Sequence, residues 1–283
     1  MLAKSVASPG ADVVNLDGSS GVVSGLKAGM RSSANGIGFT VPQAGVRVNA
    51  EAMLTNGQTI EVAVDSRADG SVVVHKGAEA EPVGMVSGVN PCADPTHSIA
   101  GPKWNKTYSW VFNAGSTPSI ISASGAESAL KTSVSRIVNG YNNCGQGDAI
   151  SATHSYAGRT TSLPDISTSA ACLSLDRKSE MGFAALPSGM VGMTCWWSLS
   201  GEIIEGDIMF NKNIKWYLKK PRRCSSRWSL HAAAAHEIGH LYGLNHVSEA
   251  DHGSLTMSPK IMSCQKSEVT LGLGDLKGLE ALY

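Results

Sequence analysis

The sequence has few charged residues and no long apolar run. Only 16% of its 283 residues are charged, and 23 basic residues balance 23 acidic ones. This balance gives no indication of nucleic acid or of an anionic membrane as a partner. No apolar run approaches the ~18 residues of a membrane span. No apolar stretch of signal-peptide type follows Met1, so we expect that a signal has been removed or that export takes another route.

Cysteine pairs of the C-x-x-C type are also missing, although the chain has six cysteines. An even number of widely spaced cysteines favours three disulfides and an oxidising, extracellular setting, so we expect a secreted protein. Six buried, reduced thiols are the alternative. The disulfide candidates are Cys92, Cys144, Cys172, Cys195, Cys224 and Cys264.

The strongest helix-promoting run of the sequence is Ala232–Ala235. Ser229 precedes it and can cap the helix, because its hydroxyl can satisfy a free backbone N–H. Gly243 falls where this helix must end, and a glycine can take the left-handed conformation that reverses the chain. The sequence therefore predicts a short helix closed by a sharp turn at Gly243.

Three histidines lie on and just after this predicted helix. His236 and His240 are four residues apart, so both imidazoles project from one face and can bind one ion. The turn at Gly243 can bring back His246 as a third ligand. Three nitrogen ligands and one open position are typical of a catalytic zinc site, and Glu237 lies close enough to reach a water there. Solvated histidines on a surface helix are the alternative.

The stretch His236–His246 has the pattern H-E-x-x-H-x-x-G-x-x-H, which resembles the metzincin signature. Three further stretches resemble matrixins, one branch of the metzincins, and keep the order of that family. They are Pro102–Thr107 at the opening of the domain, Leu255–Pro259 around the Met-turn methionine Met257, and Asp275–Tyr283 at the final helix. The likeness covers residues 102–283 and is similar to bacterial secreted members.

The resemblance implies a secreted zinc metalloendopeptidase with protein or peptide substrates. His236, His240 and His246 would hold one catalytic Zn²⁺, with Glu237 as general base. The strand Met190–Ser198 would be the sheet edge that binds an extended peptide. Met209 stands where animal matrixins place a histidine for a second zinc, so a second zinc is not expected.

The expected fold class is α+β, or mixed α/β. From Lys103 onward we expect a metzincin-type domain with a twisted, mostly parallel sheet, an active-site helix and a Met-turn. Its predicted elements are a helix at 124–139, strands at 107–112, 150–156 and 166–175, and a hairpin of strands 190–198 and 203–210. A basic stretch, residues 212–227, is expected to be a solvated loop.

Residues 1–90 contain no cysteine, tryptophan or tyrosine and are rich in glycine, valine and serine. Segments 60–64 and 71–75 predict a hairpin closed near Asp69-Gly70. We expect a small β-rich segment, joined at 84–95 to a peptidase domain at 91–283. Because it lies upstream, a propeptide that covers the active site is favoured over an accessory spacer.

Cys92 has two opposed interpretations. Animal matrixins carry a cysteine at this place whose thiolate fills the fourth zinc position, but Asn90–Pro95 lacks the arginine that precedes it. Using Cys92 as a ligand would also leave an odd thiol. We therefore predict a disulfide, with Cys144 as the favoured partner.

Two other function classes remain open: a zinc hydrolase of a non-peptide bond, and a catalytically silent, zinc-stabilised binding module. Glu237 argues against the silent module, because a structural site needs no base beside its ligands. The sequence leaves open the cleavage preference, any Ca²⁺ site and the oligomeric state. Met262 is a second candidate for the Met-turn, after Met257.

Overall fold

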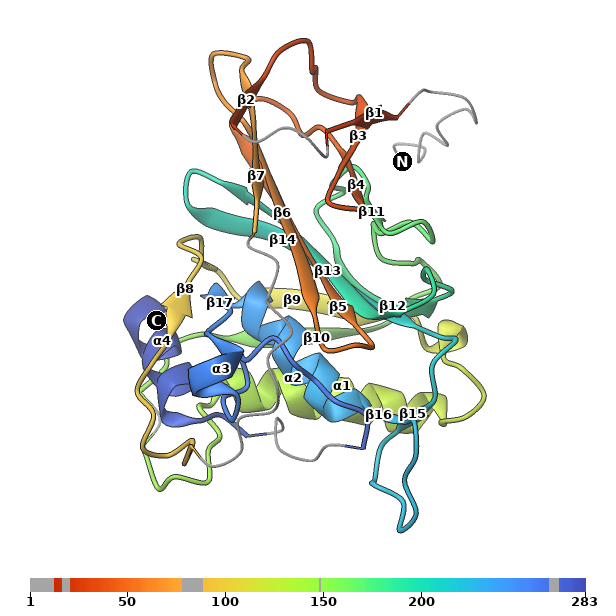
Figure 1. Ribbon diagram of the computed structural model, residues 1–283, viewed down its shortest axis with the longest axis vertical. Helices are drawn as coiled ribbons and strands as arrows, with labels where there is room; N and C mark the ends of the chain where they lie inside the picture. The colour runs from red at the N-terminus through yellow and green to blue at the C-terminus, as the bar shows by residue number, and fades with distance from the viewer. Residues whose placement is uncertain (1–12, 17–20, 78–88, 148, 265–269) are drawn as a thin grey trace.

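The computed structural model describes residues 13–16, 21–77, 89–147, 149–264 and 270–283. A long twisted sheet runs through the molecule, and helices α1 and α2 lie on one face of its lower part (Figure 1). Part of the predicted junction at 84–95 lies outside the described residues. The strands are β1 (Val14–Asn15), β2 (Gly21–Val23), β3 (Arg31–Ala34), β4 (Ile37–Thr40), β5 (Val46–Leu54), β6 (Thr59–Ser66), β7 (Val72–Lys76), β8 (Ser98–Ile99), β9 (Tyr108–Phe112), β10 (His154–Arg159), β11 (Ala171–Cys172), β12 (Ser179–Ala184), β13 (Met190–Leu199), β14 (Glu202–Asn211), β15 (Trp216–Tyr217), β16 (Trp228–Ser229) and β17 (Leu244–Asn245). The helices are η1 (Ala114–Ser116), α1 (Ala123–Val138), α2 (Leu230–Leu241), α3 (Glu249–His252) and α4 (Leu273–Leu282).

The main sheet has nine described strands in the order β10-β9-β12-β14-β13-β5-β6-β7-β2. The pairings from β10 to β14 are parallel, and β13 returns antiparallel to β14. Within residues 91–283 the sheet is thus mostly parallel, as predicted. The N-terminal strands then extend the same sheet with antiparallel pairings, which the sequence did not predict.

Strand β5 pairs with β13 along its whole length, from Met190 opposite Leu54 to Leu199 opposite Val46, with one register shift between Met190 and Gly192. The prediction that β13 is a free sheet edge is therefore wrong for this chain, because β5 satisfies its backbone hydrogen bonds. The hairpin predicted near Asp69-Gly70 is confirmed as β6 and β7.

The two faces of β5 belong to two hydrophobic clusters, as the alternation of side chains along a strand requires. Met53 packs in the cluster that contains α1 and α2. Val48, Ala50 and Ala52 pack in a second cluster on the other face, with Met193 and other residues of β13. The N-terminal strands and the peptidase strands therefore share buried apolar surface.

Most predicted elements of the peptidase domain are confirmed. The helix predicted at 124–139 is α1, whose first turn is capped by Ser122 through a hydrogen bond from the Gly125 N–H. The predicted hairpin is β13 and β14, closed by Ser200-Gly201, with both residues at positive φ. The strand predicted at 166–175 is reduced to β11, because the chain turns at Ala170, which has a φ of 57°.

Strand β12 was not predicted, although it lies between β9 and β14 and all six of its residues are buried. Its sequence contains Glu180 and Gly182, residue types that are depleted in strands, so no β-type pattern marks it. Burial on both faces also removes the alternation of polar and apolar residues on which the prediction depends.

Three disulfides use all six cysteines. Cys92 pairs with Cys144, as predicted, Cys172 with Cys195, and Cys224 with Cys264. The bridge from Cys92 closes a loop of 52 residues, which the chain-entropy model converts to about 4 kcal/mol of stabilisation. None of the described helices is long and apolar enough to cross a membrane.

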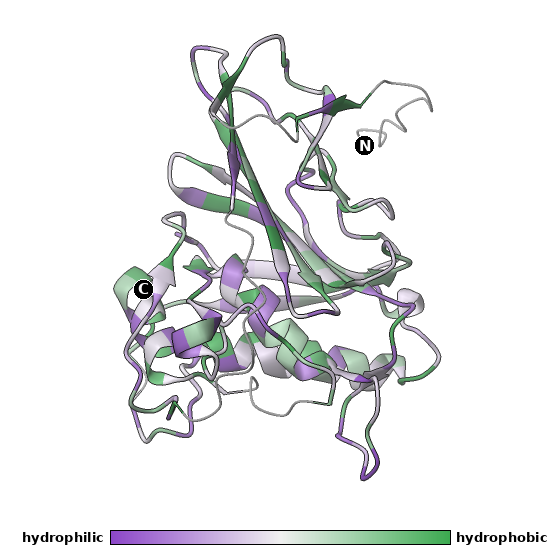
Figure 2. Ribbon diagram, viewed as in Figure 1, coloured by the Kyte–Doolittle hydropathy of each residue, from purple (hydrophilic) through white to green (hydrophobic). Residues whose placement is uncertain are grey.

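The basic stretch at 212–227 is mostly an exposed loop between β14 and α2, as expected. Figure 2 shows hydrophilic residues at the tip of this loop and hydrophobic residues along the strands of the sheet. The loop is tied at its base by the short pairing of β15 with β16.

A group of three carboxylates, of which Asp165 and Glu205 are buried and Asp176 is partly buried, lies at β14. One oxygen from each of Asp165, Asp176 and Glu205 lies within 4.8 Å of the others. Burial, together with the charges of the two aspartates, raises the pKa of Glu205 from 4.5 to about 8. An all-oxygen group of this kind differs from the nitrogen ligands that zinc prefers.

Replacing Glu205 should change how stability depends on pH. The pKa is higher in the folded chain than in the unfolded one, so the stability contribution is fully present below 4.5 and is lost as the pH rises through 8. Glu205→Gln cannot ionise, so in a chelator its melting temperature should exceed that of the wild type increasingly from pH 5 to pH 8.5. Glu202→Gln, on the same strand but outside this group of three carboxylates, is the control. A difference for Glu205→Gln that does not vary with pH would contradict the interpretation.

Candidate metal centre

Helix α2 positions the first two histidines. Ser229 caps it, as predicted, by accepting a hydrogen bond of 3.2 Å from the Ala232 N–H. Gly243 then reverses the chain with a φ of 83°, as predicted. A Cβ at this residue would also lie 2.6 Å from the carbonyl oxygen of Pro102, so both backbone conformation and space require glycine.

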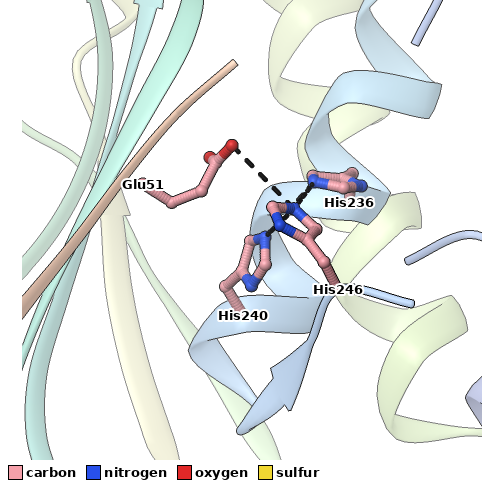
Figure 3. Close-up of side chains that lie close together, drawn as sticks. All are labelled: Glu51, His236, His240 and His246. Carbon is pink, nitrogen blue, oxygen red and sulfur yellow. Dashed lines mark hydrogen bonds and ion pairs between the residues drawn. The ribbon is translucent and has the colours of Figure 1, made fainter. Parts of the chain in front are cut away.

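The three histidines converge on one point, as predicted. The Nε2 atoms of His236 and His240 are 3.2 Å apart, and they lie 3.0 Å and 3.1 Å from the Nε2 atom of His246. Figure 3 shows the three rings turned toward one another beside α2. Three ligands around a tetrahedral zinc, at about 2.0–2.1 Å each, would be separated by roughly 3.3 Å.

The other ring nitrogen of each histidine has its own partner. His236 Nδ1 lies 2.9 Å from the carbonyl oxygen of Thr256, and His240 Nδ1 lies 3.1 Å from that of Leu244. Since a carbonyl oxygen only accepts, both Nδ1 atoms carry the proton and donate it. Each Nε2 of these two rings is then left with a lone pair, and these lone pairs face each other. Such a juxtaposition is repulsive unless a cation accepts them.

Both helix histidines are held in the neutral form that a metal requires. Burial, followed by the charge of His246, lowers the pKa of His236 to about 3. The same causes, with His236 added, place the pKa of His240 well below its ordinary value. Trp196 supports this arrangement, because its ring stacks on His240 with centroids 5.8 Å apart.

Glu237 follows His236 on α2, and its carboxylate contacts Thr194 of β13. Its Oε2 accepts a hydrogen bond from the hydroxyl of Thr194, whereas no backbone N–H or hydroxyl of the described residues donates to Oε1. Burial raises the pKa of Glu237 to about 7, and the bond from Thr194 opposes this shift. A Cβ at residue 192 would lie 3.4 Å from Oε1 of Glu237, so the lack of a side chain at Gly192 keeps the space beside this oxygen open.

Met257 lies under α2 and is 2% exposed. A Cβ on Gly239 would lie 2.3 Å from the sulfur of Met257, so the methionine packs directly against the helix between the two ligands. The turn around it is fixed by Asp275, whose carboxylate accepts hydrogen bonds from the N–H groups of Thr256 and Met257. Thr256 in turn holds His236, so the turn and the ligand are linked.

Two glutamates of the N-terminal strands also reach the centre, and the sequence analysis missed both. Glu51 of β5 has an oxygen 4.0 Å from His246 Nε2, and it groups with the three histidines as a possible metal ligand. Glu61 of β6 forms an ion pair with His246 through Nδ1. Burial and the nearby Glu237 carboxylate hold the pKa of Glu51 well above its usual range. No local motif marks either glutamate.

Other residues considered in the sequence lie elsewhere. His231 is on the first turn of α2 and makes no contact with the three ligands that the structure records. His252 pairs instead with Asp94, at 2.8 Å. Met209 is fully buried in the cluster between the N-terminal strands and β13, and Trp197 packs in the same cluster.

The residues present fit zinc. Three imidazole nitrogens converge at tetrahedral spacing, two of them are oriented through Nδ1 by backbone carbonyls, and a carboxylate partner orients the third. Glu237 lies beside these three histidines but is not one of the possible metal ligands.

Residues 188–283 match the family described as Matrixin. A comparison with curated protein sequences gives no match. The matched residues include β13, α2 with its histidines, the turn at Met257 and the final helix α4. With the three-histidine zinc site and Glu237 inside the matched region, this part of the chain belongs to the matrixin family of metzincin zinc metalloendopeptidases.

Proposed function

We propose that the chain is a secreted endopeptidase in which Glu237 is the general base for water attack on a peptide bond. The observation that carries this proposal is the position of Glu237, next to the converging histidines, with Oε2 held by Thr194 and with no backbone N–H or hydroxyl of the described residues on Oε1. The three disulfides support an extracellular setting, because such bonds persist in oxidising compartments.

The residues around the zinc would divide the work as follows. Bound zinc supplies Lewis acidity, which acidifies water and polarises a carbonyl. Oε1 of Glu237 accepts the proton of the attacking water and later delivers it to the leaving amine. Thr194 fixes the carboxylate of Glu237 through Oε2, so that Oε1 keeps one orientation. A pKa near 7 suits a group that must both accept and return a proton near neutral pH.

Glu237→Gln should retain zinc and lose most of the peptidase activity. The amide keeps the size of the side chain and leaves the three histidines in place, but it cannot accept the proton, so turnover of casein should fall by about 10²–10⁴-fold. Zinc content is measured on the same preparation, and Glu280→Gln, on the exposed side of α4, is the control. Near wild-type turnover with full zinc would end this proposal.

We also propose that Met257 is the Met-turn methionine, since it packs against Gly239 between the ligands. Met257→Ala removes a buried side chain and should cost about 2–5 kcal/mol of stability. The zinc-loaded variant should unfold at a lower temperature and lose zinc faster to a chelator, with partial loss of activity. Met262→Ala is the comparison, and damage confined to this second variant would move the Met-turn to Met262.

A further inference from the structure

Strand β5 places one carboxylate at the active centre. Glu51 lies directly opposite Thr194 in the pairing of β5 with β13, and Thr194 is the residue that holds Glu237. Because side chains alternate along a strand, Glu51 and Met53 face the same side, toward α2. Met53 is accordingly buried in the cluster that contains α2, so the register is anchored two residues from Glu51.

Glu51 is fully buried, yet no backbone N–H or hydroxyl of the described residues donates to either of its oxygens. Figure 3 shows its carboxylate pointing from β5 toward the three histidine rings. Its oxygen is one of four ligand atoms that all lie within 4.8 Å of one another, the other three being histidine nitrogens. The Glu237 carboxyl group is the nearest partner of Glu51, and a proton shared between the two is the metal-free way to relieve their burial. A cation among the histidine nitrogens relieves it as well, because a buried carboxylate is costly unless its charge is balanced.

A divalent cation supplies the missing charge. The two helix histidines are neutral metal ligands and add no positive charge. Glu51 and Glu237 bring two carboxylates into the same buried space. One zinc ion balances both. Three histidines and one carboxylate then fill the four positions of a closed site, whereas a catalytic site keeps one position open.

Strand β6, which pairs with β5, also contacts the metal centre. Its Glu61 pairs with Nδ1 of His246, the ligand that lies outside helix α2. The hairpin of β5 and β6, residues 46–66, therefore contacts the centre through two glutamates and covers β13 with a paired strand. Cys92 cannot be the fourth zinc ligand instead of Glu51, because it is bonded to Cys144.

We propose that the hairpin of β5 and β6 is a built-in inhibitor, in which the Glu51 carboxylate is the fourth zinc ligand and β5 covers the strand β13 that a peptide would pair with. This inference rests on the proposed peptidase function. In this case only the small fraction of molecules in which β5 has separated from β13 cleaves substrate.

The test uses the full chain loaded with Co²⁺, whose visible absorption reports the metal's ligands, and acetohydroxamate as a small probe for an open coordination position. In the wild type, Glu51 should exclude the probe. In Glu51→Ala the space of the missing carboxylate is free, so acetohydroxamate should bind at least tenfold more tightly and shift the cobalt spectrum. The zinc-loaded variant should also release zinc to a chelator at least tenfold faster. Asp65→Ala is the control, since Asp65 is a carboxylate of the same hairpin that pairs with Arg47 and His75 instead.

Equal probe binding by the wild type and Glu51→Ala would overturn the inference. If Glu51→Ala does not fold, Glu51→Asp decides the matter, because the shorter side chain keeps the charge but withdraws the carboxylate from the metal. Glu51→Asp that admits the probe would support the proposal, and Glu51→Asp that excludes it as the wild type does would overturn it. Failure of the proposed function has a different signature: a zinc-loaded Glu51→Ala that admits the probe but cleaves no peptide.

Discussion

The close approach of three histidine Nε2 atoms, 3.0–3.2 Å apart, is the constraint on which the rest of the structure depends. The lone pairs of the two helix histidines repel each other, and the chain nevertheless fixes both rings through the carbonyl oxygens of Thr256 and Leu244. The cap at Ser229, the reversal at Gly243 and the buried turn at Met257 all serve to hold these rings at that spacing. A bound cation turns the repulsion into the most stable part of the site.

The second feature is that the sheet continues past the peptidase strands into the N-terminal segment. β5 satisfies the backbone of β13, and both strands contribute to a buried cluster on the face away from α2. The N-terminal strands are therefore packed against the peptidase domain over two faces, not attached by a linker alone. The division of the chain at residue 90 remains a prediction, although strands from both sides of it share one sheet.

The sequence predicted the centre well because its determinants are local. His236, Glu237 and His240 share one helix, and Gly243 sets the turn that returns His246, so periodicity and turn chemistry were enough. Counting cysteines predicted that Cys92 is disulfide-bonded, and its favoured partner, Cys144, is the one that the structure shows. Glu51 and Glu61 could not be found in this way, because the histidines lie in a distant part of the chain and the two glutamates meet them only through the register of β5 on β13. Strand β12 escaped for the opposite reason: burial on both faces leaves no alternation to detect.

The central claim is that the converging histidines bind one zinc ion, and X-ray absorption at the zinc edge of the zinc-loaded full chain tests it most directly. The account predicts one zinc per chain, with three imidazole nitrogens at about 2.0–2.1 Å, oxygen as the remaining ligand and no sulfur. Fewer than three imidazoles, or a zinc–sulfur distance of about 2.3 Å, would contradict it.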